Sequence, residues 1–128
     1  MTVNDLTEAV IQEAIQIHRE LGPGLLESVY ETVLAGRLQR RRLDVQRQVS
    51  VPIEYDGHSF GAAFKIDVLV QETLILEIKS VDRLQKVHGK QLLTYLRLTK
   101  QPVGLLLNFS GETMREGIKR VVNNYRSE

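Results

Sequence analysis

Two acidic residues interrupt the most apolar stretches of the sequence. Asp67 lies within the run Ile-Asp-Val-Leu-Val at 66–70, and Glu77 lies within Leu-Ile-Leu-Glu-Ile-Lys at 74–79. Carboxylates rarely enter such runs without a partner, because removing an unpaired charge from water costs free energy. These two acids are therefore the first candidates for chemistry.

The spacing of the two runs predicts a β-hairpin that brings the acids together. If residues 71–73 form its loop, Asp67 faces Glu77. Directly opposed side chains have Cβ atoms only about 5 Å apart, so two ionised carboxylates would repel each other. A shared proton, the ammonium of Lys79 on the same face, or a divalent cation would offset that repulsion. We take the lysine and the cation together as the leading hypothesis.

The chemistry that fits these residue types is metal-assisted phosphodiester hydrolysis. Mg²⁺ accepts one or two carboxylates and keeps several waters. An ammonium group such as that of Lys79 can stand beside the attacking water or the phosphate. The alternative is a buried triad in which the charges of Asp67, Glu77 and Lys79 only neutralise one another.

A helical spacing after this strand adds three polar side chains. Gln91 and Tyr95 are four residues apart and share one face, and His88 falls one turn earlier. An amide and a phenol over a metal pocket could hold a phosphate or a water. The alternative is an amphipathic core tyrosine with a wet hydroxyl, beside a solvated glutamine and a surface histidine.

Length and composition restrict the class of protein. The chain has 128 residues, no cysteine and a formal net charge of +1. This length fits one domain over 1–128, and the lack of cysteine excludes disulfides, thiolate metal sites and thiol nucleophiles. No apolar run is long enough for a membrane span or a signal peptide, so we expect no membrane association and a soluble, cytoplasmic protein.

The hydrophobic periodicity predicts an α/β fold. The expected elements, in chain order, are helices over 6–21 and 26–38, strands over 45–53, 60–70 and 74–81, a helix over 84–98, a strand over 103–107 and a helix over 114–125. A strand reached by a helical crossover normally lies parallel to the strand that it left. The order α-α-β-β-β-α-β-α therefore predicts a mixed central sheet flanked by helices.

The segment Gly24-x-x-Glu27-x-x-Tyr30 carries the naming motif of the GxxExxY proteins. The sequence resembles this family, which is placed in the PD-(D/E)XK nuclease superfamily, over almost its whole length. The resemblance implies a restriction-endonuclease-like fold, with Asp67 and Glu77 as metal ligands and Lys79 placing the water. It also implies that Glu27 completes the metal site.

The resemblance extends to the helix that follows, where Gln91 and Tyr95 look like the Gln-x-x-x-Tyr element of RecB-type exonucleases. One departure from the superfamily signature is Ile66, which stands where proline is usual. The resemblance implies a Mg²⁺- or Mn²⁺-dependent nuclease, with DNA favoured over RNA as substrate. The alternative function is a catalytically inactive module that keeps the fold and binds nucleic acid or protein.

Contact with nucleic acid must come from local clusters, because the net charge is small. The candidates are Arg40, Arg41, Lys65 and His88. Such groups would give salt-sensitive, sequence-independent phosphate contacts, although a solvated helix end explains the arginines equally well. A domain of this size covers little nucleic acid, so a homodimer or a larger protein partner is a further expectation.

Overall fold

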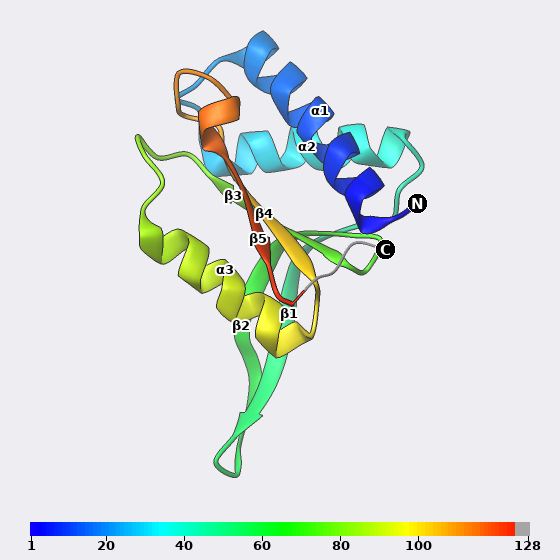
Figure 1. The fold of residues 1–128 in the computed structure, drawn as a ribbon, viewed down its shortest axis with the longest axis vertical. Coiled ribbons are helices and arrows are strands. Elements are labelled where there is room, and N and C mark those ends of the chain that lie inside the picture. The colour runs from blue at the N-terminus through cyan, green and yellow to red at the C-terminus, as the bar shows by residue number, and fades with distance from the viewer. Residues whose placement is uncertain (125–128) are drawn as a thin grey trace.

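The computed structural model describes residues 1–124 as two helical layers on a central sheet (Figure 1). Helix α1 spans Val3–Leu21 and begins with a capping box between Thr2 and Asp5. Helix α2 spans Glu27–Arg40 and packs with α1 on one face of the sheet. Both helices agree with the predicted spans.

The sheet has five strands in the order β1-β2-β3-β4-β5. The strands are β1 Val45–Tyr55, β2 His58–Val70, β3 Leu74–Lys79, β4 Val103–Asn108 and β5 Ile118–Val122. Strands β3 and β4 are parallel and are joined through helix α3, Lys86–Thr99; the other neighbours are antiparallel. The predicted mixed sheet with helices on both faces is confirmed.

Two hydrophobic clusters fill the space between the layers. The larger one joins α1 and α2 to the sheet, and its members include Ile17, Leu34, Leu76 and Leu105. The smaller one joins α3 to the opposite face through Ile66, Ile75, Leu92, Leu96 and Leu106. All six residues of β4 are buried, as expected of a central strand covered on both sides.

The predicted final helix over 114–125 is wrong. A short 3₁₀ turn, η1 Arg115–Gly117, leads into β5, which pairs with β4 from Leu107 opposite Ile118 to Val103 opposite Val122. The buried backbone of β4 needs hydrogen-bond partners along both edges, and β-branched residues at 118–122 supply one of them. Tyr125, at the end of the predicted helix, lies outside the described residues.

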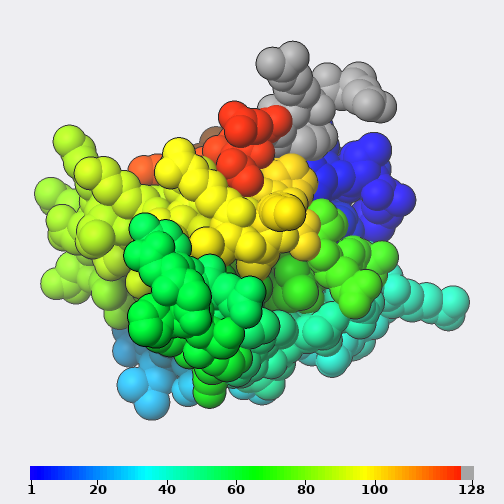
Figure 2. Space-filling model, turned by 90° about the horizontal axis from the view of Figure 1, so that it is seen from below, coloured from blue at the N-terminus to red at the C-terminus, as the bar shows by residue number. Residues whose placement is uncertain are grey.

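The β1–β2 hairpin extends beyond the rest of the sheet. Its turn is at Asp56 and Gly57, as predicted, and Tyr55 pairs with His58. Figure 2, seen from below, shows this hairpin in green beside the yellow part of α3. Among the described residues, no helix is long and apolar enough to cross a lipid bilayer.

Candidate active site

The two acids meet where β2 and β3 separate. The pairing of these strands ends with Val68 opposite Leu76. Just beyond, Asp67 Oδ2 accepts the backbone N–H of Ile78 at 2.8 Å, and Glu77 Oε1 lies 3.5 Å from the backbone nitrogen of Asp67. Side-chain carboxylates therefore replace the backbone ladder at this point, and the predicted proximity of Asp67 and Glu77 is confirmed.

Glu77 is the buried member of the pair, with 5% of its surface exposed. Burial, followed by the negative charge of Asp67, raises the pKa of Glu77 to about 8. At neutral pH Glu77 therefore holds a proton in the absence of a cation. Protonation of Glu77 is therefore one way in which the repulsion between the two acids is avoided.

Lys79 lies two residues further along β3, on the face that carries Glu77. Its positive charge opposes the rise in the pKa of Glu77, so the two groups are within electrostatic reach. Within residues 1–124, no ion pair or hydrogen bond occupies the Lys79 ammonium. The neutralised triad is therefore not formed, and the ammonium is available to another group.

Helix α3 brings Tyr95 into the field of the acids. The Tyr95 ring stacks on Phe64 with centroids 4.0 Å apart and planes 5° apart. Burial, then the charges of Glu77 and Asp67, raise the pKa of Tyr95. Gln91, one turn earlier, is exposed. Both side chains of the predicted Gln-x-x-x-Tyr element thus belong to the helix that covers the acid pair.

Glu31 of α2 is a third carboxylate near the acid pair, which it reaches through the Gln48 side chain. The sequence pattern did not predict this residue as part of the site. Glu31 is 6% exposed, and it accepts hydrogen bonds from Arg47 at 3.0 Å and from the Gln48 amide at 2.8 Å. The same amide lies 3.5 Å from Asp67 Oδ1. Glu31 shares a helix face with the buried Leu34. An acid among apolar residues is the same signal that indicated Asp67, so this signal could have identified Glu31.

The Gly-x-x-Glu-x-x-Tyr segment has a structural part and an exposed part. Tyr30 is fully buried, donates its hydroxyl proton to Gly22 O at 2.6 Å and accepts the N–H of Leu25 at 3.1 Å. Glu27 is exposed and lines an open hollow with Ser80 among other residues. No hydrogen bond in the described part of the chain joins Glu27 to Asp67 or Glu77.

The sequence matches the family model of the PD-(D/E)XK nuclease superfamily over residues 4–121. The chain belongs to this superfamily. Its members are in general nucleases that hydrolyse phosphodiester bonds, so a nucleic-acid substrate is implied. Neither the curated proteins nor the solved structures contain a match.

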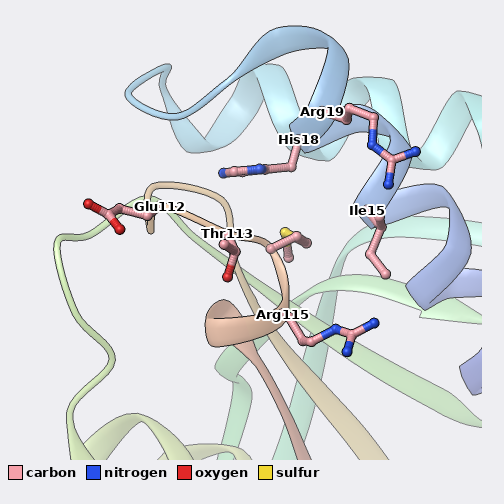
Figure 3. Close-up of a pocket in the computed structure, with 7 residues that line it drawn as sticks. Ile15, His18, Arg19, Glu112, Thr113 and Arg115 are labelled. Atoms are coloured by element: carbon pink, nitrogen blue, oxygen red, sulfur yellow. The ribbon is translucent and has the colours of Figure 1, made fainter.

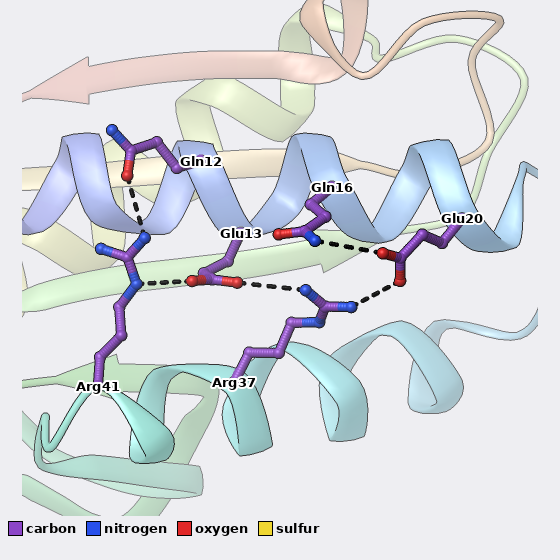
Figure 4. Close-up of polar contacts among 6 residues, drawn as sticks. All are labelled: Gln12, Glu13, Gln16, Glu20, Arg37 and Arg41. Atoms are coloured by element: carbon purple, nitrogen blue, oxygen red, sulfur yellow. Dashed lines mark hydrogen bonds and ion pairs between the residues drawn. The ribbon is translucent and has the colours of Figure 1, made fainter.

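In this PD-(D/E)XK domain, the predicted nucleic-acid residues have different environments. Arg41 is committed to the helix layer, where Nε contacts Glu13 at 2.6 Å and the guanidinium also donates to Gln12 (Figure 4). Arg40 and Lys65 are exposed. His88 Nδ1 accepts the backbone N–H of Gln85 at 3.0 Å, so its ring helps to cap α3.

A hollow of about 310 Å³ between α1 and the segment before η1 lies apart from the acid pair. Figure 3 shows Ile15, His18 and Arg19 of α1 facing Thr113 and Arg115. Its one carboxylate is Glu112, and none of the predicted site residues lines it. Throughout residues 1–124, no three His, Asp or Glu side chains lie close enough together to hold a metal ion.

Proposed function

We propose that this protein is a Mg²⁺- or Mn²⁺-dependent nuclease that hydrolyses phosphodiester bonds of DNA in the cytoplasm. The observation that carries the proposal is the placement of Asp67 and the buried Glu77 side by side on β2 and β3, with the unengaged Lys79 next to them. The pair brings no stability of its own, because burial and the charge of Asp67 oppose the ionisation of Glu77. A function that uses both acids explains their placement.

The donor set suits a small, hard cation. Mg²⁺ binds through one or two carboxylates and retains waters, so Asp67 and Glu77 suffice to hold it. When bound, such a cation polarises a phosphoryl oxygen and lowers the pKa of a coordinated water. Glu77 must lose its proton for this, so we expect binding to release about one proton near neutral pH. Glu27 stays a predicted ligand that no contact supports.

The remaining residues have roles that their positions allow. In hydrolysis, a water gives up a proton as its oxygen bonds to phosphorus, the bond from phosphorus to the leaving oxygen breaks, and the leaving oxygen takes up a proton. The Lys79 ammonium would hold the attacking water or a non-bridging oxygen, since it has three donors and no internal partner among the described residues. Tyr95 and Gln91 would hold the phosphate from the α3 side.

The exposed Lys65 and Arg40 are the proposed phosphate contacts outside the centre, because nothing within residues 1–124 neutralises them. Arg41 is a weaker candidate, since its guanidinium is bound to Glu13. Membership of the GxxExxY group is proposed on the Gly24, Glu27 and Tyr30 motif. A second copy of the chain, extending the surface for the nucleic acid, is likewise part of the proposal.

The test is cleavage by the purified protein of end-labelled single-stranded DNA, duplex DNA and RNA, with Mg²⁺, Mn²⁺, Ca²⁺ or EDTA. We expect Mg²⁺ or Mn²⁺ to support cleavage of DNA. Asp67→Asn and Glu77→Gln should each lower the rate by about 100-fold or more, because the cation loses a ligand. Asp56→Asn, a change of the same kind at the distant hairpin turn, is the matched control and should leave the rate unchanged.

Two outcomes would contradict the proposal. Equal cleavage by wild type and Asp67→Asn would assign the activity to a contaminating nuclease. Cleavage absent with every cation, together with DNA binding that persists in Glu77→Gln, would favour the inactive binding module instead.

A further inference from the structure

The centre of β1 contains a backbone conformation that strands do not normally adopt. Gln48 has φ 50° and therefore lies in the left-handed region, which non-glycine residues seldom enter. Arg47 pairs with Val68 and Val49 pairs with Ile66, so Gln48 stands opposite Asp67. The strained residue and the first acid of the candidate active site occupy one position of the hairpin.

The hairpin changes faces at this position. Val45 packs in the cluster under α1 and α2, whereas Val49 packs in the cluster under α3. These two residues would share a face in a regular strand, because side chains alternate with a period of two. In β2, Val68 and Ile66 are divided between the same two clusters. Both strands therefore turn their side chains to the opposite face of the sheet, β1 at Gln48 and β2 at Asp67.

The inversion alone does not explain why the residue is glutamine. Gln48 is exposed, so packing of its side chain does not force the left-handed backbone. Glycine would adopt the same φ without steric cost. A strained non-glycine residue persists where its side chain contributes something that offsets the strain, and such residues cluster at functional sites.

The contribution of the side chain is visible in its hydrogen bonds. The Gln48 amide nitrogen donates to Glu31 Oε1 at 2.8 Å and lies 3.5 Å from Asp67 Oδ1. Glu31 is itself fixed by Arg47, whose guanidinium contacts the other carboxylate oxygen at 3.0 Å. Asp67 is held from the other side by the N–H of Ile78. The amide thus ties the carboxylate of β2 to a buried, anchored acid of α2.

We propose that Gln48 is a positioning residue, whose amide holds the Asp67 carboxylate in the orientation that a divalent cation requires. This inference rests on the proposed function, since it concerns the same acid pair. The left-handed backbone is what aims the amide between Glu31 and Asp67. Outer hydrogen-bond partners of metal-binding carboxylates typically contribute 10- to 100-fold to metal affinity or activity.

The test compares Gln48→Gly, Gln48→Asn and Gln46→Gly with wild type. Gln48→Gly removes the amide and keeps a residue suited to positive φ, while asparagine keeps a shorter amide and also tolerates this conformation. Gln46→Gly introduces the same backbone freedom two residues away on β1. Affinity for Mn²⁺ is measured by titration calorimetry, and the Mn²⁺ dependence of DNA cleavage and the thermal midpoint are measured in parallel.

We expect Gln48→Gly to weaken Mn²⁺ binding by about 10-fold or more and to raise the half-saturating Mn²⁺ concentration equally. Its kcat at saturating Mn²⁺ should stay near wild type, and so should its thermal midpoint, because the relief of backbone strain offsets the lost hydrogen bond to Glu31. Gln48→Asn should fall between wild type and Gln48→Gly, and Gln46→Gly should bind Mn²⁺ like wild type.

Mn²⁺ affinity of Gln48→Gly within twofold of wild type would overturn the inference, and so would an equal loss in Gln46→Gly. Mn²⁺ binding by wild type without cleavage of any nucleic acid would refute the nuclease, while the affinities would still decide the role of Gln48. Failure of wild type to bind Mn²⁺ at all would overturn both.

Discussion

Glu77 reaches back across the point where β2 and β3 part, and its carboxyl oxygen lies 3.5 Å from the backbone nitrogen of Asp67. Asp67 makes the complementary contact, with Oδ2 accepting the N–H of Ile78 at 2.8 Å. Each carboxyl group therefore lies against a backbone N–H of the opposite strand, at the point where the backbone pairing of β2 and β3 has ended. This reciprocal arrangement keeps the two carboxyl groups close together although Glu77 is buried.

Removing the charge of Glu77 should make the protein less sensitive to alkaline pH. The pKa of Glu77 is raised from 4.5 to about 8, so between these values the folded state keeps a proton that the unfolded state has lost. The stability of wild type therefore falls as the pH rises through this window. At about 1.4 kcal/mol per pKa unit, Glu77→Gln should gain on the order of a few kcal/mol over wild type between pH 5 and pH 9.

Urea denaturation at pH 5, 7 and 9 in EDTA measures this effect. A difference between Glu77→Gln and wild type that stays constant with pH would show that Glu77 titrates normally.

Lys79→Ala should abolish most of the proposed cleavage without unfolding the protein. The ammonium has no internal partner among residues 1–124, so we expect a change in stability within about 0.5 kcal/mol. The cleavage rate with Mn²⁺ should fall about 100-fold or more, because the group beside the reacting phosphate is lost. Lys119→Ala, a change of the same kind at an exposed position of the edge strand β5, is the matched control and should retain the rate.

The opposite pattern would identify a structural lysine. Breaking a buried charge triad costs about 3–5 kcal/mol, so a loss of that size in Lys79→Ala with unchanged cleavage would restore the neutralised-triad interpretation.

Tyr30→Phe should destabilise the fold, whereas Tyr55→Phe should not. The Tyr30 hydroxyl is buried and satisfies both Gly22 O at 2.6 Å and the N–H of Leu25 at 3.1 Å. Leaving these groups unpaired costs about 1–3 kcal/mol. Tyr55 is 70% exposed, and its hydroxyl should contribute little. Equal free energies of unfolding for the two variants would show that water replaces the Tyr30 contacts.

Arg41→Ala should lower stability by about 1 kcal/mol, and Arg40→Ala should stay within about 0.5 kcal/mol of wild type. Arg41 contacts Glu13 at 2.6 Å, on the side where Arg37 also binds Glu13 at 3.4 Å (Figure 4). Thermal denaturation at low and high salt measures the effect, which should shrink as salt screens the pair. A larger loss of DNA affinity in Arg41→Ala than in Arg40→Ala would return Arg41 to the nucleic-acid surface.

Much of the site could be predicted from local signals. An acid inside an apolar run is conspicuous whatever the fold, and the length of the loop between the two runs is enough to place Asp67 near Glu77. The helix that carries Gln91 and Tyr95 follows from its periodicity. The helical crossover then predicts the parallel pair β3 and β4.

Other features depend on contacts between distant segments. The residues at 118–122 carry a short apolar pattern that suits either a helix or a strand, and the unpaired edge of β4 decides in favour of the strand. Arg41 belongs to a basic run, and the proximity of Glu13 on another helix turns it into a structural residue. In each case the deciding partner, β4 for residues 118–122 and Glu13 for Arg41, is distant along the chain.

The sequence by itself determined the two acids, the lysine and the layered α/β order, because these follow from residue type and from period along the chain. Only the tertiary structure decided that Glu31 and Gln48 reach Asp67 and that Lys79 has no partner among the described residues. Those relations join different elements, and one of them needs a left-handed residue inside a strand. Local preference opposes that conformation, so only the assembled fold can impose it.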